Sequence, residues 1–354
     1  MSLNIGLDGN QPINIENGRI NPQVADPSII ADTGTGWVRI NFILGPWTSP
    51  DDTTARGPNH LTWEQTYRQI INGFRQRNVK IYGLIDETAA FTSLNDQLRE
   101  PPAWPSSGLP MNSWIDEYVE NFAKIVAMFP DIEIFESFNE PDDWHAETRN
   151  WIHPEWFAVI LQRIYDEVRR ESHVKLISGS VQGLTINDNA GARYLDAVYQ
   201  TGQTKLHWGT TGRPFPFDGV GYHIYVAEDF TADQAAQDKK IRNAYRSYLS
   251  EVLQKLQKHH LGSKQLYISE MGWHTNGPNR DAREKFQADS LHTAFDFLRS
   301  NPDIAPHIAY VSLFCTQDFD ATTNDKYYGL YRTSGVTVND RKAAYNTFKS
   351  ICEA

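Results

Sequence analysis

Short apolar runs alternate with longer segments of helical periodicity along the whole chain. An apolar run of about four to eight residues between turn signals is typical of a buried strand, and apolar residues at every third or fourth position are typical of a one-faced helix. Strands that alternate with helices predict a parallel sheet with crossover helices. The pattern predicts strands at residues 3–9, 36–43, 80–86, 132–138, 175–181, 217–225, 265–271 and 307–314.

The helical periodicity is clearest in two segments, 112–129 and 231–261. Each carries a single apolar stripe, which in the second segment includes Ile241, Tyr245 and Leu249. A helix with one apolar face packs that face on a core and turns the other toward water. Both segments therefore fit the outer ring of a barrel.

Eight strand–helix pairs without a linker rich in glycine, proline or charge predict one (β/α)8 TIM barrel that spans residues 1–354 as a single α/β domain. The alternative is a doubly wound open sheet, which usually carries a glycine-rich phosphate-binding turn after its first strand. Neither G-x-G-x-x-G nor G-x-x-x-x-G-K-[ST] occurs in the chain, so we favour the barrel. The long segments 44–61, 87–111 and 139–153 then lie at the carboxyl-terminal face, where barrels hold their active sites.

The composition is that of a globular protein, with 40% hydrophobic and 22% charged residues. No apolar run approaches the roughly 20 residues that cross a bilayer, so we expect no membrane partner. The formal net charge of −11 disfavours nucleic acid and anionic surfaces as partners. The ten Trp, 16 Tyr and 17 Phe residues are a large number of aromatic rings, on which sugars can stack.

The sequence gives little reason to expect a cofactor or a metal. Cys315 and Cys352 are the only cysteines, and neither H-E-x-x-H nor paired Cys/His spacing occurs. The acidic segment 318–325 could hold calcium, but it lacks EF-hand spacing and a solvated loop is the favoured interpretation. We expect a monomer, because no extra apolar stripe is evident. No signal peptide is visible, so we expect a cytoplasmic protein, or a secreted one if a signal peptide preceded Met1.

Polar side chains stand out where the barrel pattern predicts inward-facing positions. Arg39 faces away from its apolar neighbours in the second strand, and a buried arginine requires a carboxylate partner. His223 and Tyr225 share one face of the sixth strand. Taken alone, the arginine has about even odds of forming a purely structural ion pair, and a lone histidine is more often a core residue than a catalytic one.

Glu140 and Glu270 are distant in sequence, yet each lies at the carboxyl end of a predicted strand, the fourth and the seventh. Cleavage of a glycosidic bond requires two carboxyl groups across a cleft, one to protonate the leaving oxygen and one to attack the anomeric carbon or activate water. Different surroundings keep one group protonated and the other ionised, and Arg39 near the second carboxylate would favour its ionised form.

These residues resemble the clan A glycoside hydrolases, including cellulase-like family 5 and family 39 enzymes. The stretch FESFNEP at 135–141 resembles the Asn-Glu-Pro motif of that clan, and LYISEMGW at 266–273 resembles its nucleophile strand. The resemblance implies a (β/α)8 barrel in which Glu140 is the general acid/base and Glu270 the nucleophile. It also implies that Asn139 binds the sugar 2-hydroxyl.

The resemblance extends to two further strands. Clan members carry an arginine on the second strand, matched by Arg39, and a His-x-Tyr on the sixth, matched by His223 and Tyr225. By this resemblance the tyrosine hydroxyl contacts the nucleophile. The implied protein is a retaining glycoside hydrolase of β-linked sugars, with an oligo- or polysaccharide as its partner and no cofactor.

The chain also departs from the pattern. Many clan members end the eighth strand with a Trp below the reacting sugar, whereas here Phe314 or Cys315 occupies that place. The histidine that some families place after the third strand is also missing, and Asp86 stands near that end instead. Asp86 could contact sugar hydroxyls or accept backbone hydrogen bonds, and its rim position favours sugar contact.

Tryptophans in the predicted rim loops are candidates for stacking on sugar rings. For each of them, packing of the loop onto the barrel is about equally plausible. Trp63, Trp114 and Trp156 lie in helical segments and are assigned to packing. The rim candidates are Trp47, Trp104, Trp144 and Trp273.

Two alternatives to a glycosidase remain open at the sequence level. One is a catalytically inactive barrel that only binds carbohydrate, which the unusual eighth strand would fit. The other is a barrel enzyme of unrelated chemistry, such as metal-assisted proton abstraction. Neither the sugar, nor the linkage, nor exo or endo action follows from the sequence, because these depend on rim loops.

Overall fold

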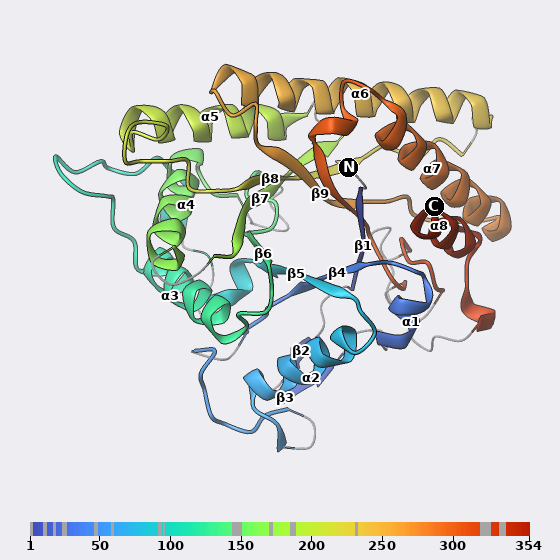
Figure 1. The fold of residues 1–354 in the computed structure, drawn as a ribbon, viewed down its shortest axis with the longest axis horizontal. Coiled ribbons are helices and arrows are strands. Elements are labelled where there is room, and N and C mark those ends of the chain that lie inside the picture. Colours follow the sequence, from blue (N-terminus) through green and yellow to red (C-terminus); the bar gives the residue numbers. More distant parts are fainter. Residues whose placement is uncertain are drawn as a thin grey trace.

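The protein is a closed barrel of eight parallel strands surrounded by helices, as a computed structural model shows (Figure 1). The structure describes residues 3–9, 13–16, 19–22, 27–45, 49–57, 60–90, 94, 96–143, 151–169, 173–184, 189–230, 233–318, 327–332 and 338–354. The barrel strands are β1 (Asn4–Asp8), β4 (Trp37–Asn41), β5 (Lys80–Ile85), β6 (Ile134–Ser137), β7 (Lys175–Leu184), β8 (Gly219–Tyr225), β9 (Gln265–Met271) and β10 (Ile308–Leu313). Pairing of β1 with both β10 and β4 closes the ring, so the predicted (β/α)8 TIM barrel is confirmed.

Eight α-helices lie within the described residues. From β4 onward, each barrel strand is followed by one helix, from α2 after β4 to α8 after β10. The helices predicted at 112–129 and 231–261 are confirmed as α3 and α6. Side chains cap both: Asn112 accepts from the Trp114 amide and Asp233 accepts from the Ala236 amide. The helices are α1 (Pro27–Asp32), α2 (Trp63–Arg75), α3 (Ser113–Met128), α4 (Pro154–Val168), α5 (Ala190–Lys205), α6 (Gln234–Lys258), α7 (Arg280–Ser300) and α8 (Ala343–Glu353).

The sequence analysis missed a hairpin between β1 and α1. Strands β2 (Ile13–Glu16) and β3 (Arg19–Pro22) pair antiparallel in a separate two-stranded sheet. Each strand has only four residues, and polar side chains interrupt both. Such a segment has too few alternating apolar positions to stand out from a loop.

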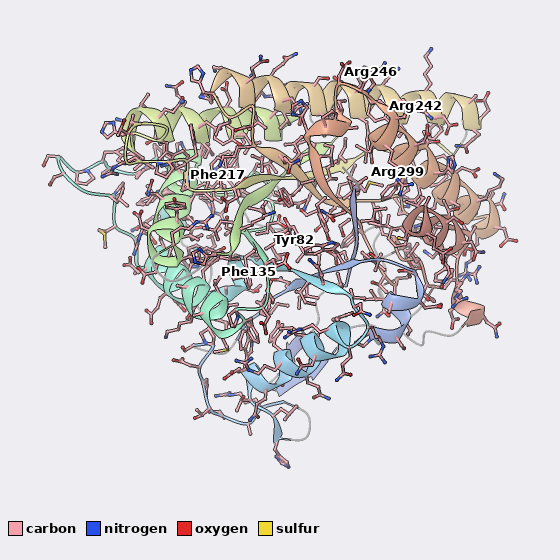
Figure 2. The ribbon with its side chains drawn as sticks, viewed as in Figure 1. Tyr82, Phe135, Phe217, Arg242, Arg246 and Arg299 are labelled. Atoms are coloured by element: carbon pink, nitrogen blue, oxygen red, sulfur yellow. The ribbon has the colours of Figure 1, made fainter. Side chains whose placement is uncertain are left out.

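Aromatic side chains fill the amino-terminal half of the barrel interior. Trp37, Tyr82 and Tyr310 belong to one buried cluster, in which the rings of Tyr82 and Tyr310 stack with centroids 4.7 Å apart. Figure 2 labels Tyr82 inside the ring of strands, and it labels Arg242 and Arg246 on α6 in the outer layer. Because rings plug this end, polar groups gather at the other end of the barrel, above them.

The helices form an outer layer that packs on the strands. Trp63, Trp114 and Trp156 are buried in the core, as predicted. Arg242 on α6 pairs with Asp296 on α7 at 2.7 Å, which ties neighbouring helices together on the outside. No helix in the described residues is both long enough and apolar enough to cross a bilayer.

Candidate active site

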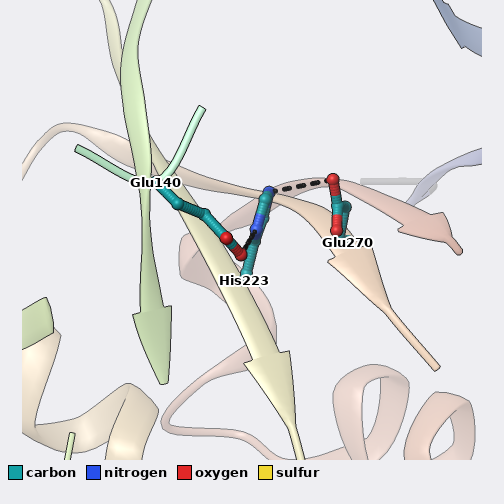
Figure 3. Close-up of side chains that lie close together, drawn as sticks. All are labelled: Glu140, His223 and Glu270. Atoms are coloured by element: carbon teal, nitrogen blue, oxygen red, sulfur yellow. Dashed lines mark hydrogen bonds and ion pairs between the residues drawn. The ribbon is translucent and has the colours of Figure 1, made fainter. Parts of the chain in front are cut away.

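Glu140, which follows β6, and Glu270 on β9 meet at the carboxyl-terminal end of the barrel (Figure 3). One side-chain atom from each of Glu140, His223 and Glu270 lies within 4.8 Å of the other two. Figure 3 shows the His223 ring standing between the two carboxyl groups. The structure therefore brings together the two acidic residues that the sequence analysis selected.

An irregularity in β9 turns Glu270 toward the interior. Ile268 pairs with Tyr222, but the next pair joins Glu270 to His223, so Ser269 is an extra residue on β9. Ser269 already faces the interior, where its hydroxyl contacts Glu136, and regular alternation would point Glu270 outward. A bulge of this kind re-aims the side chain that follows it. Both Ser269 and Glu270 consequently face the barrel centre.

Three polar neighbours surround the Glu270 carboxylate. The Arg39 guanidinium donates from Nη1 to Oε1 at 2.6 Å, and the Tyr225 hydroxyl donates to Oε2 at 2.7 Å. Burial by itself would raise the pKa of Glu270, but the charges of His223 and Arg39 and the Tyr225 hydrogen bond outweigh it and lower the pKa. Glu270 is therefore an ionised carboxylate at neutral pH.

Glu140 is held in an uncommon backbone conformation. Its φ of 49° lies in the left-handed region, which costs a non-glycine residue roughly 1–2 kcal/mol. Two backbone hydrogen bonds hold it there: the Glu140 amide donates to the Ser180 carbonyl, and the Asp143 amide donates to the Glu140 carbonyl, both at 2.9 Å. Backbone strain of this sort concentrates at functional sites. Here it directs the Glu140 side chain toward His223.

His223 links the two acidic side chains. Its side chain is fully buried, its Nδ1 lies 2.7 Å from Glu140 Oε1, and its Nε2 lies 3.6 Å from Glu270 Oε1. Burial opposes the charged imidazolium, but Glu270 and Glu140 together raise the pKa of His223. A positive charge on this ring in turn favours the ionised form of Glu270.

Arg39 connects three carboxylates, on β1, β6 and β9, and one amide that follows β6. Besides Glu270, it contacts Asp8 on β1 at 2.9 Å, Glu136 on β6 at 3.1 Å and the Asn139 amide oxygen at 2.9 Å. Burial alone would lower the pKa of Arg39, but the three carboxylates raise it well above its usual value. Arg39 is therefore a permanent cation whose position several strands determine.

The sequence analysis missed Asp8 and Glu136 as members of this site. Glu136 is fully buried, and besides Arg39 it accepts hydrogen bonds from the Ser180 amide and hydroxyl. Both residues occupy inward positions on predicted strands, and the sequence required a carboxylate partner for a buried Arg39. The alternation of inward and outward positions along the strands, together with the need of Arg39 for a carboxylate partner, could have identified both residues.

A second buried carboxyl group lies close to Glu140. Asp142 accepts from the backbone NH of Gln182 through both oxygens, at 3.2 and 3.1 Å. Burial raises the pKa of Asp142 well above its usual range, and the charge of Glu140 adds to the effect. Asp142 thus joins the loop after β6 to β7, which helps to fix the segment that carries Glu140.

Asp86 supports the turn that follows β5. It accepts from the Thr88 amide at 2.9 Å and from the Thr88 hydroxyl through one oxygen, and from the Asn41 amide group through the other. Burial raises the pKa of Asp86 in spite of these hydrogen bonds. The sequence left two roles open for Asp86, sugar contact and acceptance of backbone hydrogen bonds. The structure shows the second, through the Thr88 amide, and sugar contact stays a prediction.

The four rim tryptophans have different surroundings. Trp47 and Trp144 lie outside the described residues. Trp273 is only 1% exposed, so in this conformation its ring offers no open face for stacking. Trp104 is partly buried and its indole NH donates to Glu155 at the start of α4.

At the end of β10, Phe314 is partly exposed and Cys315 is buried. The Phe314 ring packs edge-on against Tyr328, with centroids 5.7 Å apart. Of these two residues, only Phe314 has an exposed part, so it is the one whose ring could reach a bound sugar. The acidic segment 318–325 lies outside the described residues except for Asp318.

Glu140, His223 and Glu270 are the described side chains that together could hold a metal ion. Their atoms are already engaged with one another, with Tyr225 and with Arg39, whose positive charge lies 2.6 Å from Glu270. A bound cation would have to displace these contacts. The geometry thus fits an acid–base site better than a metal centre.

Two cavities of about 760 and 370 Å³ lie at the opposite, amino-terminal end of the strands. Ile132 and Glu133, which precede β6, line both of them. Neither cavity is lined by any residue of the carboxyl-terminal cluster. Neither cavity therefore adjoins the two glutamates.

Comparisons with known proteins support the fold. No protein-family model matches the chain. No curated protein sequence matches it either. Solved structures do match over nearly the whole chain, and those described below are glycoside hydrolases.

One match is a family 39 glycoside hydrolase from the gut symbiont Bacteroides cellulosilyticus WH2, with 15% identity and a TM-score of 0.60 over 99% of this chain and 63% of that chain. A second is an exo-β-1,4-mannosidase from Opitutaceae bacterium strain TAV5, with 12% identity and a TM-score of 0.59 over 99% and 59%. This chain thus spans less than two thirds of either protein. An endo-β-1,4-glucanase from Xanthomonas axonopodis pv. citri matches at 12% identity and a TM-score of 0.59 over 99% and 98%. At these identities the likeness shows a shared fold.

Proposed function

We propose that this protein is a retaining glycoside hydrolase that cleaves β-linked sugars, with Glu270 as nucleophile and Glu140 as general acid/base. The observation that carries the proposal is the spacing of the two side chains, whose nearest oxygens lie within 4.8 Å. Retaining enzymes hold their carboxyl groups about 5 Å apart, whereas inverting enzymes leave roughly 6.5–9.5 Å for a water molecule. The clan A fold of the structural matches is consistent with this proposal.

In the first step, the Glu270 carboxylate attacks the anomeric carbon and the bond to the leaving oxygen breaks. Glu140 gives its proton to that oxygen, so the leaving sugar departs as an alcohol. The lowered pKa of Glu270, which results from His223, Arg39 and Tyr225 in spite of burial, keeps the nucleophile ionised. A covalent glycosyl ester on Glu270 remains.

In the second step, Glu140 accepts a proton from water, and the water oxygen attacks the same anomeric carbon. The ester bond breaks and Glu270 returns to its ionised form. His223 Nδ1 lies 2.7 Å from Glu140 Oε1, so the ring holds the acid/base carboxyl group in place through both steps. Two displacements restore the original anomeric configuration.

Asn139 is suited to bind the reacting sugar. Its Oδ1 accepts from Arg39 at 2.9 Å, which fixes the amide so that Nδ2 is available as a donor. We propose that Nδ2 contacts the 2-hydroxyl, an interaction that strengthens in the transition state. Arg39 would thereby align the nucleophile and the sugar-binding amide at once.

Kinetics of Glu140→Gln test the assignment of the acid. A glutamine in this position cannot protonate the leaving oxygen, so glycosides with poor leaving groups should lose about 10²–10⁴-fold in kcat/KM. Activated aryl glycosides, which leave without protonation, should lose far less in the first step. An equal loss for both substrate types would contradict the role of Glu140.

The stereochemistry of the first product tests the retaining mechanism itself. Proton NMR of a β-glycoside digest should show the β-anomer before mutarotation. Early appearance of the α-anomer would indicate inversion. Purified enzyme that binds sugars but turns over neither aryl glycosides nor polysaccharides would instead favour the carbohydrate-binding alternative.

A further inference from the structure

The hydroxyl that holds Glu270 comes from a ring that depends on a neighbour. Tyr225 donates to Glu270 Oε2 at 2.7 Å from the end of β8. Its ring lies edge-on against the ring of Tyr328, with centroids 5.8 Å apart and an interplanar angle of 78°. Edge-to-face pairs at this spacing restrict both rings, and they contribute about 0.5–1.5 kcal/mol beyond their buried area.

Tyr328 contacts the carboxyl-terminal ends of three barrel strands. Besides Tyr225 at the end of β8, its ring packs edge-on against His274, just beyond β9, and Phe314, just beyond β10, with centroids 5.9 and 5.7 Å away. Gly272 leaves the space that the ring needs, since a Cβ there would lie 2.9 Å from the Tyr328 ring. The Tyr328 ring is thus seated among these side chains on the nucleophile side of the site.

Buried polar side chains fix the backbone that carries this ring. The Gln287 amide donates to the carbonyls of Tyr328 and Trp273, both at 2.9 Å. The Lys342 ammonium donates to the Tyr327 carbonyl at 3.0 Å and to Asp318 at 2.7 Å. Side chains from α7 and from the start of α8 therefore set the position of residues 327 and 328.

We propose that Tyr328 is a positioning residue of the nucleophile, which keeps the Tyr225 hydroxyl on Glu270 through ring packing. The inference rests on the proposed function, in which Glu270 is the nucleophile. The Tyr225 ring has rotational freedom about two side-chain bonds, and the hydrogen bond to Glu270 needs one orientation. Without Tyr328 on its flank, the Tyr225 ring can rotate and the hydrogen bond is lost for part of the time.

A titration of Glu270 itself tests the inference without any turnover. The side-chain carboxyl signals of protein carrying ¹³C-labelled glutamate are followed by NMR against pH, and Glu270→Gln identifies the signal. Because the Tyr225 hydrogen bond lowers the pKa of Glu270, Tyr225→Phe should raise it. Tyr328→Leu should also raise the pKa of Glu270, although the effect must pass through Tyr225.

A double-mutant cycle separates an effect through Tyr225 from a general loosening of the site. In the Tyr225→Phe background there is no hydroxyl to position, so Tyr328→Leu should produce no further rise. An additional rise of equal size would overturn the inference. So would a Tyr328→Leu protein that folds as the wild type does and titrates as the wild type does.

Two matched variants serve as controls. Tyr328→Phe keeps the ring and should leave the Glu270 titration where it is in the wild type. Phe230→Leu removes another ring that packs edge-on against His274, with centroids 5.8 Å apart, and it should also leave the titration unchanged. A shift of the same size in Phe230→Leu would mean that any loss of rim packing moves Glu270, and it would contradict a specific role for Tyr328.

Kinetics on an aryl β-glycoside provide a second measurement. Tyr328→Leu should lower kcat/KM about tenfold, and the loss should shrink below about twofold in the Tyr225→Phe background. Wild-type protein without turnover would refute the proposed function, and the titration would still decide whether Tyr328 keeps the Tyr225 hydroxyl on Glu270. Active enzyme with additive losses would refute the inference alone.

Discussion

At the scale of single residues, the chemistry depends on how the surroundings divide charge between two glutamates. Glu270 has a cation on one side and a hydroxyl donor on the other, and these contacts overcome the effect of burial on its pKa. Glu140 instead has the His223 ring as its neighbour, with Nδ1 2.7 Å from Oε1. Two identical side chains thereby acquire different tasks.

The charge of His223 makes a testable contribution to this division. Because that charge lowers the pKa of Glu270, His223→Asn should raise it, so that less Glu270 is ionised at any acidic pH. The acidic limb of the kcat/KM profile should therefore move to higher pH. At neutral pH, kcat/KM should fall about a hundredfold, because Glu140 also loses the ring contact that positions its carboxyl group.

His292→Asn provides a control for the same chemical change. His292 lies exposed on α7, so its replacement should leave both the rate and the acidic limb unchanged. A His223→Asn enzyme with a reduced rate but an unmoved acidic limb would show that His223 contributes position and not charge.

At the scale of elements, strands β1, β4 and β6 meet at one guanidinium. Asp8 and Glu136 hold Arg39 from both sides, and Arg39 then reaches Asn139 and Glu270. Strand ends are rigid supports, and a reacting group displaced by about 1 Å loses much of its rate. Residues that never touch the sugar should therefore affect the reaction.

Glu136→Gln tests this expectation on β6. The variant removes one buried carboxylate from Arg39 and replaces an acceptor of the Ser180 hydrogen bonds. The free energy of unfolding should fall by about 3 kcal/mol, because removing one partner of a buried ion pair leaves the other charge without compensation. The rate of glycoside hydrolysis should fall as well, because Arg39 loses one of its anchors.

Glu133→Gln makes the same replacement three positions earlier on an exposed side chain. Glu133 pairs only with the exposed Lys80 among the described ion pairs, at 3.0 Å, and such pairs contribute little. In urea denaturation, the free energy of unfolding of Glu133→Gln should differ from that of the wild type by less than about 0.5 kcal/mol. Similar small losses for both variants would argue against a structural role for Glu136.

The sequence predicted elements better than their irregularities. All eight barrel strands follow from the alternation of apolar runs and helical stripes, since that pattern results directly from burial against a layer of helices. The extra residue at Ser269 did not follow, because a bulge depends on pairing between strands and leaves no mark in one strand's composition. The β2–β3 hairpin was missed for its short polar strands.

At the scale of the whole molecule, the topology explains why the sequence could predict that residues far apart in the chain lie close together. Parallel strands in a closed barrel have all their carboxyl ends at one face, so strand-end residues such as Glu140, His223 and Glu270 must gather there. Which loop residues reach into that face is not determined by topology. Tyr328 illustrates the limit, because its place depends on contacts from α7 and α8.

The most direct test of the central claim is covalent trapping of the nucleophile. The protein is incubated with 2-deoxy-2-fluoro β-glycosides that carry an activated leaving group, digested, and the peptides are analysed by mass spectrometry. The account predicts one glycosyl adduct, attached to Glu270, and none in Glu270→Gln. An adduct on another residue, or turnover of the parent glycosides with Glu270 never labelled, would contradict it.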